Sequence, residues 1–303
     1  YVMYTVGFLL SNVMPTLTVD GFGKAGLSDT SSWLLTSVIV AGLSSGAILF
    51  TGLSIREPSS EQTKPLSKFS LKTLAADYWQ VLKLRPLRLL IFAVIAYLTA
   101  NTLIVADRMY VFTFQMGYSG TFISMIMLLF GLLGIVLAIP MMKLAKRFDK
   151  RSMLFVCLGL GGCALAAMRF IGVSSLPALI FLMCVFAVAS TAYWQLMPAA
   201  FYDICEVDEY ENHVKRAGTI TSTLPMAEAI ASAVGMQVLG FWLQFKGFTS
   251  GATIQSPSAL AAIFDCFTFV PGILLVVAAL IMLRFPITKQ RFETIKRALN
   301  DSV

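Results

Sequence analysis

Charged residues are scarce in this 303-residue chain, and their scarcity excludes an ordinary water-soluble domain. Asp, Glu, Lys and Arg make up 13% of the residues, whereas a soluble domain carries roughly a quarter. Hydrophobic residues make up 57%, and the charges are gathered in short stretches between long apolar runs. The composition therefore indicates a chain that folds in a lipid bilayer.

Motifs for catalysis, metal binding and phosphate binding are also missing from the sequence. It contains one histidine, His213, and no CxxC pair, HExxH, GxSxG or Walker-type loop. The five cysteines are odd in number and do not suit a disulfide framework. We therefore expect a protein that is not an enzyme and that holds no cofactor and no metal.

Long apolar runs predict about eight membrane-spanning helices, because a helix needs about 20 apolar residues to cross a bilayer. Helices are required since lipid satisfies no backbone hydrogen bonds. The predicted fold class is all-α, a polytopic membrane helical bundle. The predicted spans are residues 1–17, 32–54, 87–114, 119–142, 152–172, 175–199, 216–245 and 260–285.

The connections between these spans alternate in charge, which predicts an orientation. The basic connections are residues 56–88, 143–151 and 215–216 and the tail 284–297. Only four of the 23 Lys and Arg residues, namely Lys24, Arg108, Arg169 and Lys246, lie on or toward the other side. Because basic loops stay in the cytoplasm, we expect both ends of this chain to face the cytoplasm across the cell membrane. The net charge of +7 then reflects orientation and not a nucleic-acid partner.

The one long internal connection divides the predicted helices into two and six. Its apolar residues from Leu71 to Leu82 recur at helical spacing, which favours an amphipathic helix on the inner membrane surface. The chain opens with Tyr1 inside an apolar run, so we expect the first four helices of a twelve-helix transporter to precede it. The expected organisation is 1–54, the last two helices of the N-terminal half; 55–86, the cytoplasmic central linker; 87–285, the C-terminal six-helix half; and 286–303, a cytoplasmic tail.

The stretch from Thr191 to Ala233 carries a family resemblance. It resembles the glycoside–pentoside–hexuronide:cation symporter family of the major facilitator superfamily, in which an aromatic tenth helix leads into an acidic motif D-x-x-D-x-x-E-[YW], then Arg, then Gly and Ser. The matching residues are Trp194, Asp203, Glu206, Glu209, Tyr210, Gly218 and Ser222. The sequence departs from the family at Lys215, where the family has Arg, and at Ala229, where it has a membrane Lys.

The resemblance implies the major facilitator fold and a secondary active transporter. The expected activity is symport of a sugar or glycoside with Na⁺ or H⁺, by alternating access of two helical halves. An amphiphile or lysophospholipid carrier of the same superfamily is one alternative. A truncated membrane protein that transports nothing is another.

Charged residues after the predicted span 175–199, which corresponds to the tenth helix of the family, form a candidate cytoplasmic gate. As a gate, these residues would hold the two halves together on the cytoplasmic side in one state and move apart in the other. The alternative is a solvated face at a helix end. The candidates are Asp203, Glu206, Glu209, Tyr210 and Lys215.

Ionisable residues within predicted spans are costly in lipid and count as functional candidates. Arg169 and Asp265 lie near helix ends, from which we expect them to reach the interface. Asp107 and Arg108 point about 100° apart and cannot both face lipid cheaply. At least one is expected to line the cavity and contact substrate, unless it forms a structural ion pair.

Aromatic and polar residues on the same spans predict a sugar-sized cavity, since aromatic rings stack on sugars and polar groups bond hydroxyls. Packing inside the bundle is the alternative role for several of them. The candidates are Tyr97, Asn101, Thr191, Tyr193, Trp194 and Gln195.

Glu228 is the ionisable residue predicted to lie deepest, about 18 Å from Arg216 along its helix. It follows Pro225, whose ring removes a backbone hydrogen bond in a polar segment, as suits a hydrated cavity wall. Glu228 is therefore the candidate for cation coupling. The alternative is a protonated residue that bonds a neighbouring helix.

Overall fold

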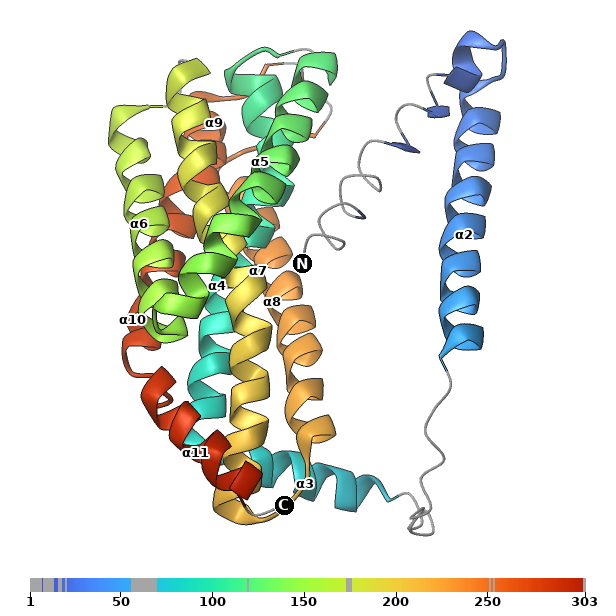
Figure 1. Ribbon diagram of the computed structural model, residues 1–303. Coiled ribbons are helices and arrows are strands. Elements are labelled where there is room, and N and C mark those ends of the chain that lie inside the picture. The colour runs from blue at the N-terminus through green and yellow to red at the C-terminus, as the bar shows by residue number, and fades with distance from the viewer. Residues whose placement is uncertain are drawn as a thin grey trace. The chain divides into compact units, whose positions relative to one another are not determined.

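The computed structural model describes residues 7, 14–15, 18–19, 21–55, 70–118, 120–172, 176–250, 252 and 254–301. Within these ranges every regular element is a helix (Figure 1). The all-α prediction is confirmed.

Seven helices in the described residues are long and apolar enough to cross a membrane. The predicted first span, residues 1–17, lies largely outside the described residues. The seven are α2 (Asp29–Ser54), α4 (Arg85–Tyr110) continued by η1 (Val111–Gln115), α5 (Gly120–Arg147), α6 (Lys150–Ile171), α7 (Leu176–Asn212), α8 (Ala217–Phe245), and α9 (Pro257–Phe264) continued by η2 (Asp265–Phe269) and α10 (Val270–Leu283). The chain is thus a multi-pass membrane protein.

Contacts divide the chain into two compact units, residues 2–73 and 74–303. In the first unit, α2 begins after Ser28, whose hydroxyl accepts a hydrogen bond from the backbone N–H of Ser31. Thr36 on α2 donates to the hydroxyl of Thr18 over 3.0 Å. The most extensive contacts lie in the second unit, which contains all the predicted site residues.

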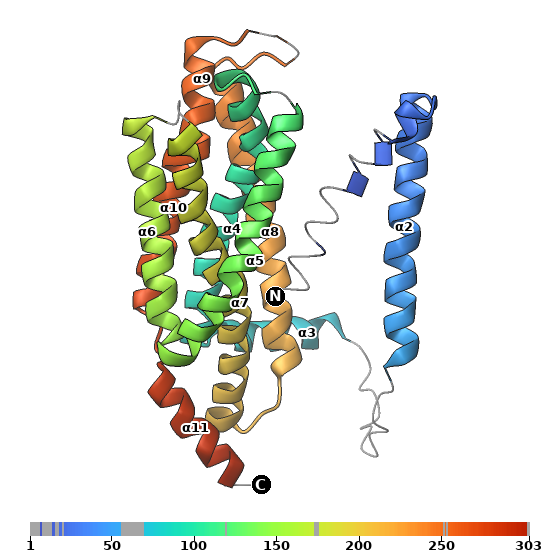
Figure 2. The ribbon, with the colours of Figure 1, turned by 45° about the horizontal axis from the view of Figure 1, so that its top comes forward.

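The second unit is a bundle in which α4 contacts α8 and α10, while α6 contacts α7 and α10 (Figure 2). Small residues allow the closest approach, as is usual between membrane helices. A Cβ placed on Gly162 of α6 would lie 2.7 Å from the carbonyl oxygen of Gly272 on α10. A Cβ on Gly235 of α8 would lie 2.9 Å from Cβ of Thr102 on α4. Glycine at these positions therefore fixes the α6–α10 and α4–α8 contacts.

Two further helices lie at the end of this unit where α7 is connected to α8 (Figure 1). Helix α3 (Leu71–Leu82) forms at the place of the predicted amphipathic linker helix. Its Tyr78 hydroxyl lies 2.7 Å from the hydroxyl of Ser222, which ties α3 to the start of α8. Helix α11 (Lys289–Asp301) follows α10, and Phe292 packs against the hydrophobic core.

Helix α7 departs from the prediction that its span ends at residue 199. It continues without a break to Asn212, so the acidic stretch that follows the predicted span is the last part of a 37-residue helix. At 1.5 Å per residue this helix is about 55 Å long and exceeds a hydrocarbon layer of about 30 Å. Hydropathy alone locates the membrane boundary and not the end of the helix.

Two short π-helical segments, η1 and η2, were not predicted from the sequence. Helix α4 changes into η1 at Val111, and α9 changes into η2 at Asp265. The two lie near each other, since the rings of Phe112 in η1 and Phe267 in η2 have centroids 6.2 Å apart. The side-chain amide of Gln115 in η1 also donates to the carbonyl oxygen of Leu260 in α9 over 2.8 Å. Such segments are rare and occur frequently at functional sites.

Candidate substrate site and charged network

Two predicted substrate residues stack against each other across the α4–α7 contact. The rings of Tyr97 on α4 and Tyr193 on α7 have centroids 3.6 Å apart and planes inclined by 13°. Both side chains are fully buried among the residues of the second unit. The pair therefore joins α4 to α7 in the middle of the bundle.

Trp194 and Glu228 lie beside this tyrosine pair. The Trp194 ring stands edge-on to Tyr193, with centroids 5.4 Å apart and planes at 88°. Trp194 is only partly buried, so some of its surface stays open. Glu228 on α8 is half-buried and lies within electrostatic range of the Tyr193 hydroxyl. The structure thus brings Tyr97, Tyr193, Trp194 and Glu228 from three helices into one cluster, which we call the aromatic cluster.

The other polar candidates on α4 and α7 lie near this cluster along their helices. The Gln195 amide donates to the carbonyl oxygen of Ala138 on α5 over 3.1 Å, which gives it a structural bond. Thr191 is buried, and Asn101 is half-buried one turn beyond Tyr97. The role of these three residues in substrate binding stays a prediction.

Asp107 and Arg108 do not form an ion pair with each other. The Asp107 side chain is 0% exposed, and neither carboxylate oxygen has a hydrogen-bond partner among the described residues. Arg108 is half-buried on another face of α4. Asp107 thus faces the inside of the bundle, whereas it lines no open cavity in the conformation described.

Arg169 and Asp265, each expected to reach the interface, form an ion pair that the sequence did not predict. The Arg169 guanidinium donates to the Asp265 carboxylate, which joins α6 to η2. The guanidinium also lies 5.9 Å from the centroid of the Phe264 ring. A partner neutralises each charge, so neither residue must leave the bundle to be solvated.

Asp203, the first gate candidate, pairs with a residue of the neighbouring helix α6. Lys150 donates to both Asp203 carboxylate oxygens, over 2.8 and 2.7 Å. Lys150 also lies 5.5 Å from the centroid of the Phe292 ring on α11. Asp203 thereby fixes α6, α7 and α11 to one another.

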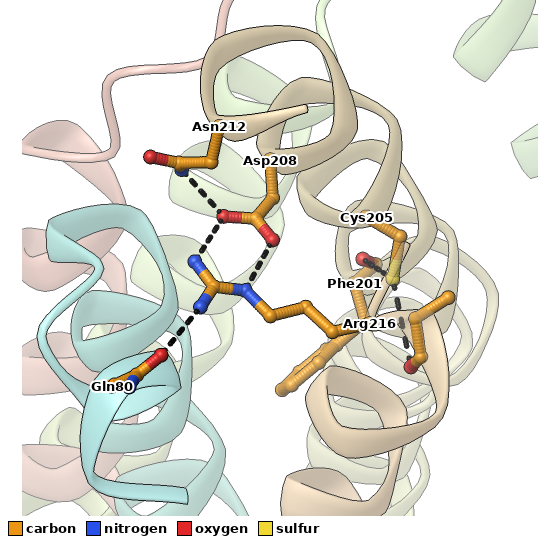
Figure 3. A network of polar contacts seen from close by, with 7 residues as sticks. Gln80, Phe201, Cys205, Asp208, Asn212 and Arg216 are labelled. Carbon is orange, nitrogen blue, oxygen red and sulfur yellow. Dashed lines mark hydrogen bonds and ion pairs between the residues drawn. The ribbon is translucent and has the colours of Figure 1, made fainter. Parts of the chain in front are cut away.

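The most buried ion pair at this end of the unit joins Asp208 to Arg216 (Figure 3). Arg216 donates from Nε and Nη2 to the two Asp208 oxygens over 2.7 and 2.9 Å, and Asn212 adds a bond of 2.8 Å. Arg216 Nη1 reaches the side-chain oxygen of Gln80 on α3 at 3.4 Å. The hydrogen bond to Asp208 raises the pKa of Arg216 further, so its positive charge is permanent. This pair links α7, the start of α8 and the linker helix.

The remaining gate candidates are more exposed than this pair. Lys215 lies 3.2 Å from Glu209, with side chains 85% and 37% exposed. Tyr210 is exposed and Glu206 is half-buried. Glu206, Glu209 and Tyr210 lie on the last turns of α7, and Lys215 lies in the connection to α8. Their role as a gate stays a prediction.

Sequence reasoning missed Asp208 and Arg216 as a structural pair. The helical period of the sequence could have revealed the pair. The spacing of three and four residues puts the following residues on one buried face: Met197, Phe201, Ile204 and Asp208. Extending that face past residue 199 would have placed Asp208 inside and Glu206 and Glu209 outside.

No group of three or more His, Cys, Asp or Glu side chains that could hold a metal ion is found in the part of the chain that the structure describes. The fold and these interior polar groups define a multi-pass helical membrane protein with ionisable residues inside its bundle.

Comparison with known proteins gives the family. The model of the family described as MFS/sugar transport protein matches residues 1–289. Because that match covers nearly the whole chain, the chain belongs to this family of the major facilitator superfamily.

Two curated proteins are similar to the chain. The glucuronide carrier protein homolog of Escherichia coli (strain K12) is 22% identical over 233 residues, which are 77% of this chain and 49% of that protein. An uncharacterized 29.9 kDa protein of Pseudescherichia vulneris is 25% identical over 159 residues, which are 52% of this chain and 57% of that protein. The chain thus spans about half the length of these curated relatives.

Proposed function

We propose that this chain is part of a secondary transporter that carries a sugar or glycoside across the cell membrane together with a cation. The observation that carries the proposal is the aromatic cluster, which sets stacked rings and a carboxylate among membrane helices. Aromatic rings and nearby polar groups are the means by which proteins bind sugars. Membership of the sugar transport family and similarity to a protein named as a glucuronide carrier homolog support the same substrate class.

The proposed mechanism is alternating access of two helical halves, with no covalent chemistry on the substrate. Residues 87–285 supply the C-terminal half, and Trp194 offers the partly open ring on which a sugar stacks. Tyr97 and Tyr193 form the wall behind it. Both ends of this chain face the cytoplasm in this proposal, as the basic connections require.

The ion pairs of α7 fit a supporting role for the inner end of this half. Asp203 binds Lys150 on α6, and Asp208 binds Arg216 just before α8, so these pairs keep the half rigid while it moves. Glu206, Glu209, Tyr210 and Lys215 remain exposed enough to contact another part of the protein. We assign the gate role to these four residues.

Sugar binding by the purified protein tests the proposal. A panel of glycosides and glucuronides is added, and the rise in thermal midpoint is measured, because a ligand that binds the native state stabilises it. We expect at least one member to stabilise the protein, and Trp194→Ala to weaken that effect. Stabilisation by lysophospholipids and by no sugar would favour the amphiphile carrier instead.

A further inference from the structure

Of the three buried carboxyl groups in the described residues, those of Asp203 and Asp208 are paired and that of Asp107 is not. Asp107 is 0% exposed and has no hydrogen-bond partner on either oxygen within the described residues. Asp265 offers a comparison on η2, because its carboxylate is paired with Arg169. No cation in the described part of the chain pairs with Asp107 in this way.

The elements packed against α4 are α7, α8, α10, η1 and η2. None of these five contains a Lys, Arg or His residue. Their titratable groups around this level are Cys266 and the paired Asp265 on η2 and Cys184 on α7, while α10 and η1 have none. Glu228 on α8 lies near Tyr193, which stacks on Tyr97, ten residues along α4 from Asp107. The Cys266 thiol lies within electrostatic range of Asp107. Among the elements described as packed against α4, no group can therefore neutralise an ionised Asp107.

An ionised carboxylate without a partner is not sustained in such surroundings, and the group takes up a proton instead. A sodium ion would need several oxygen ligands, as hard cations do. The titratable side chains around Asp107 offer only a thiol and a carboxylate that is already paired. The proton is the one cation that a single carboxylate can hold alone.

The two π-helical segments lie next to this group. The backbone N–H of Val111, at the start of η1, donates to the carbonyl oxygens of Asp107 and Arg108. Cys266, which is fully buried, belongs to η2. Thus α4 and α9 both change from α-helix to π-helix next to Asp107. A buried carboxyl group that exchanges protons needs a path to water at this place.

We propose that Asp107 is a proton-carrying carboxyl group of the transporter. Resting on the proposed function, this inference names the coupling ion as H⁺. Asp107 is protonated in the conformation described here. In the opposite conformation the proton passes from the carboxyl O–H to water, and the carboxylate later regains a proton from the other side of the membrane.

The test uses Asp107→Asn in the protein that contains this chain, reconstituted in vesicles. The amide has nearly the same shape and releases no proton. We expect sugar-driven proton movement to fall at least about tenfold, while exchange of labelled for unlabelled sugar stays within about twofold. Asp265→Asn is the matched control at a paired carboxylate, and it should keep the proton-to-sugar ratio. Sugar-driven proton movement at the wild-type rate in Asp107→Asn would overturn the proposal. Loss of this proton movement in Glu228→Gln, with its retention in Asp107→Asn, would overturn it as well.

Infrared spectroscopy of the purified protein tests the proton site without any substrate. Wild-type protein should show a carboxylic acid carbonyl band at neutral pH that is missing in Asp107→Asn and retained in Asp265→Asn. If Asp107→Asn does not fold, Asp107→Glu replaces it and should shift the position of the band. A spectrum in which no band changes with Asp107 contradicts the proposal even if the protein transports sugar. If the carboxylic acid band of Asp107 is present but the vesicles move no sugar, the proposed function is contradicted and the protonation of Asp107 is not.

Discussion

Replacing Arg216 by alanine removes the cation that neutralises Asp208, and the structure sets the size of the effect. The Asp208 side chain is 1% exposed and accepts two of its three hydrogen bonds from Arg216. Removing one member of a buried ion pair costs about 3–5 kcal/mol. Because the Arg216 side chain is 20% exposed, water can reach the vacated space, and we expect a loss of about 2–3 kcal/mol. At 2–4 °C per kcal/mol, this lowers the thermal midpoint by roughly 4–12 °C.

Lys215→Ala is the matched control, because Lys215 is the neighbouring residue and its ion pair with Glu209 is solvent-exposed. Exposed pairs contribute about 0–1 kcal/mol, so its midpoint should hardly change. The assay is thermal denaturation of the purified protein in detergent, at one scan rate for all variants. Equal shifts for the two variants, or no shift for Arg216→Ala, would refute the assignment of Asp208–Arg216 as the buried anchor of this end of the bundle.

Three further predictions concern the site, the orientation and the packing. Trp194→Ala should weaken sugar binding on the order of 5- to 30-fold, as expected for an aromatic anchor of about 1–2 kcal/mol; unchanged affinity would leave Trp194 a packing residue. In a cysteine-free background, an impermeant thiol reagent should label Ile254→Cys on intact cells and Thr294→Cys only after permeabilisation; the reverse pattern would invert the orientation. Gly162→Ala should cost about 1–3 kcal/mol, since its Cβ meets the backbone of α10. Gly159→Ala, whose Cβ would lie 3.7 Å from the nearest atom, should be tolerated, and equal thermal midpoints would contradict this contact.

The spanning helices could be predicted from the sequence because their signal is local. A run of about 20 apolar residues identifies a helix in lipid whatever it packs against. The predicted spans 152–172 and 216–245 agree closely with α6 and α8. The end of α7 could not be predicted in this way, because its last part lies beyond the apolar run and is polar on one face only.

The aromatic cluster was predicted as a set of residues but not as an arrangement. Tyr97 and Tyr193 are amphipathic side chains on separate helices, and nothing in the sequence states that their rings face each other. The Arg169–Asp265 pair shows the same limit, because its members are 96 residues apart. Which charges meet is decided by the packing of helices, and hydropathy does not encode that packing.

Uptake of a glycoside or glucuronide by energised membrane vesicles is the decisive measurement of whether the protein transports a sugar. The vesicles contain the protein in which this chain occurs, and the concentration of labelled sugar inside is followed with time. We expect saturable accumulation of the sugar above its outside concentration. This accumulation should be lost when a protonophore collapses the proton gradient. Entry that is no faster than in vesicles without the protein, for every sugar that stabilises the purified protein, would contradict it.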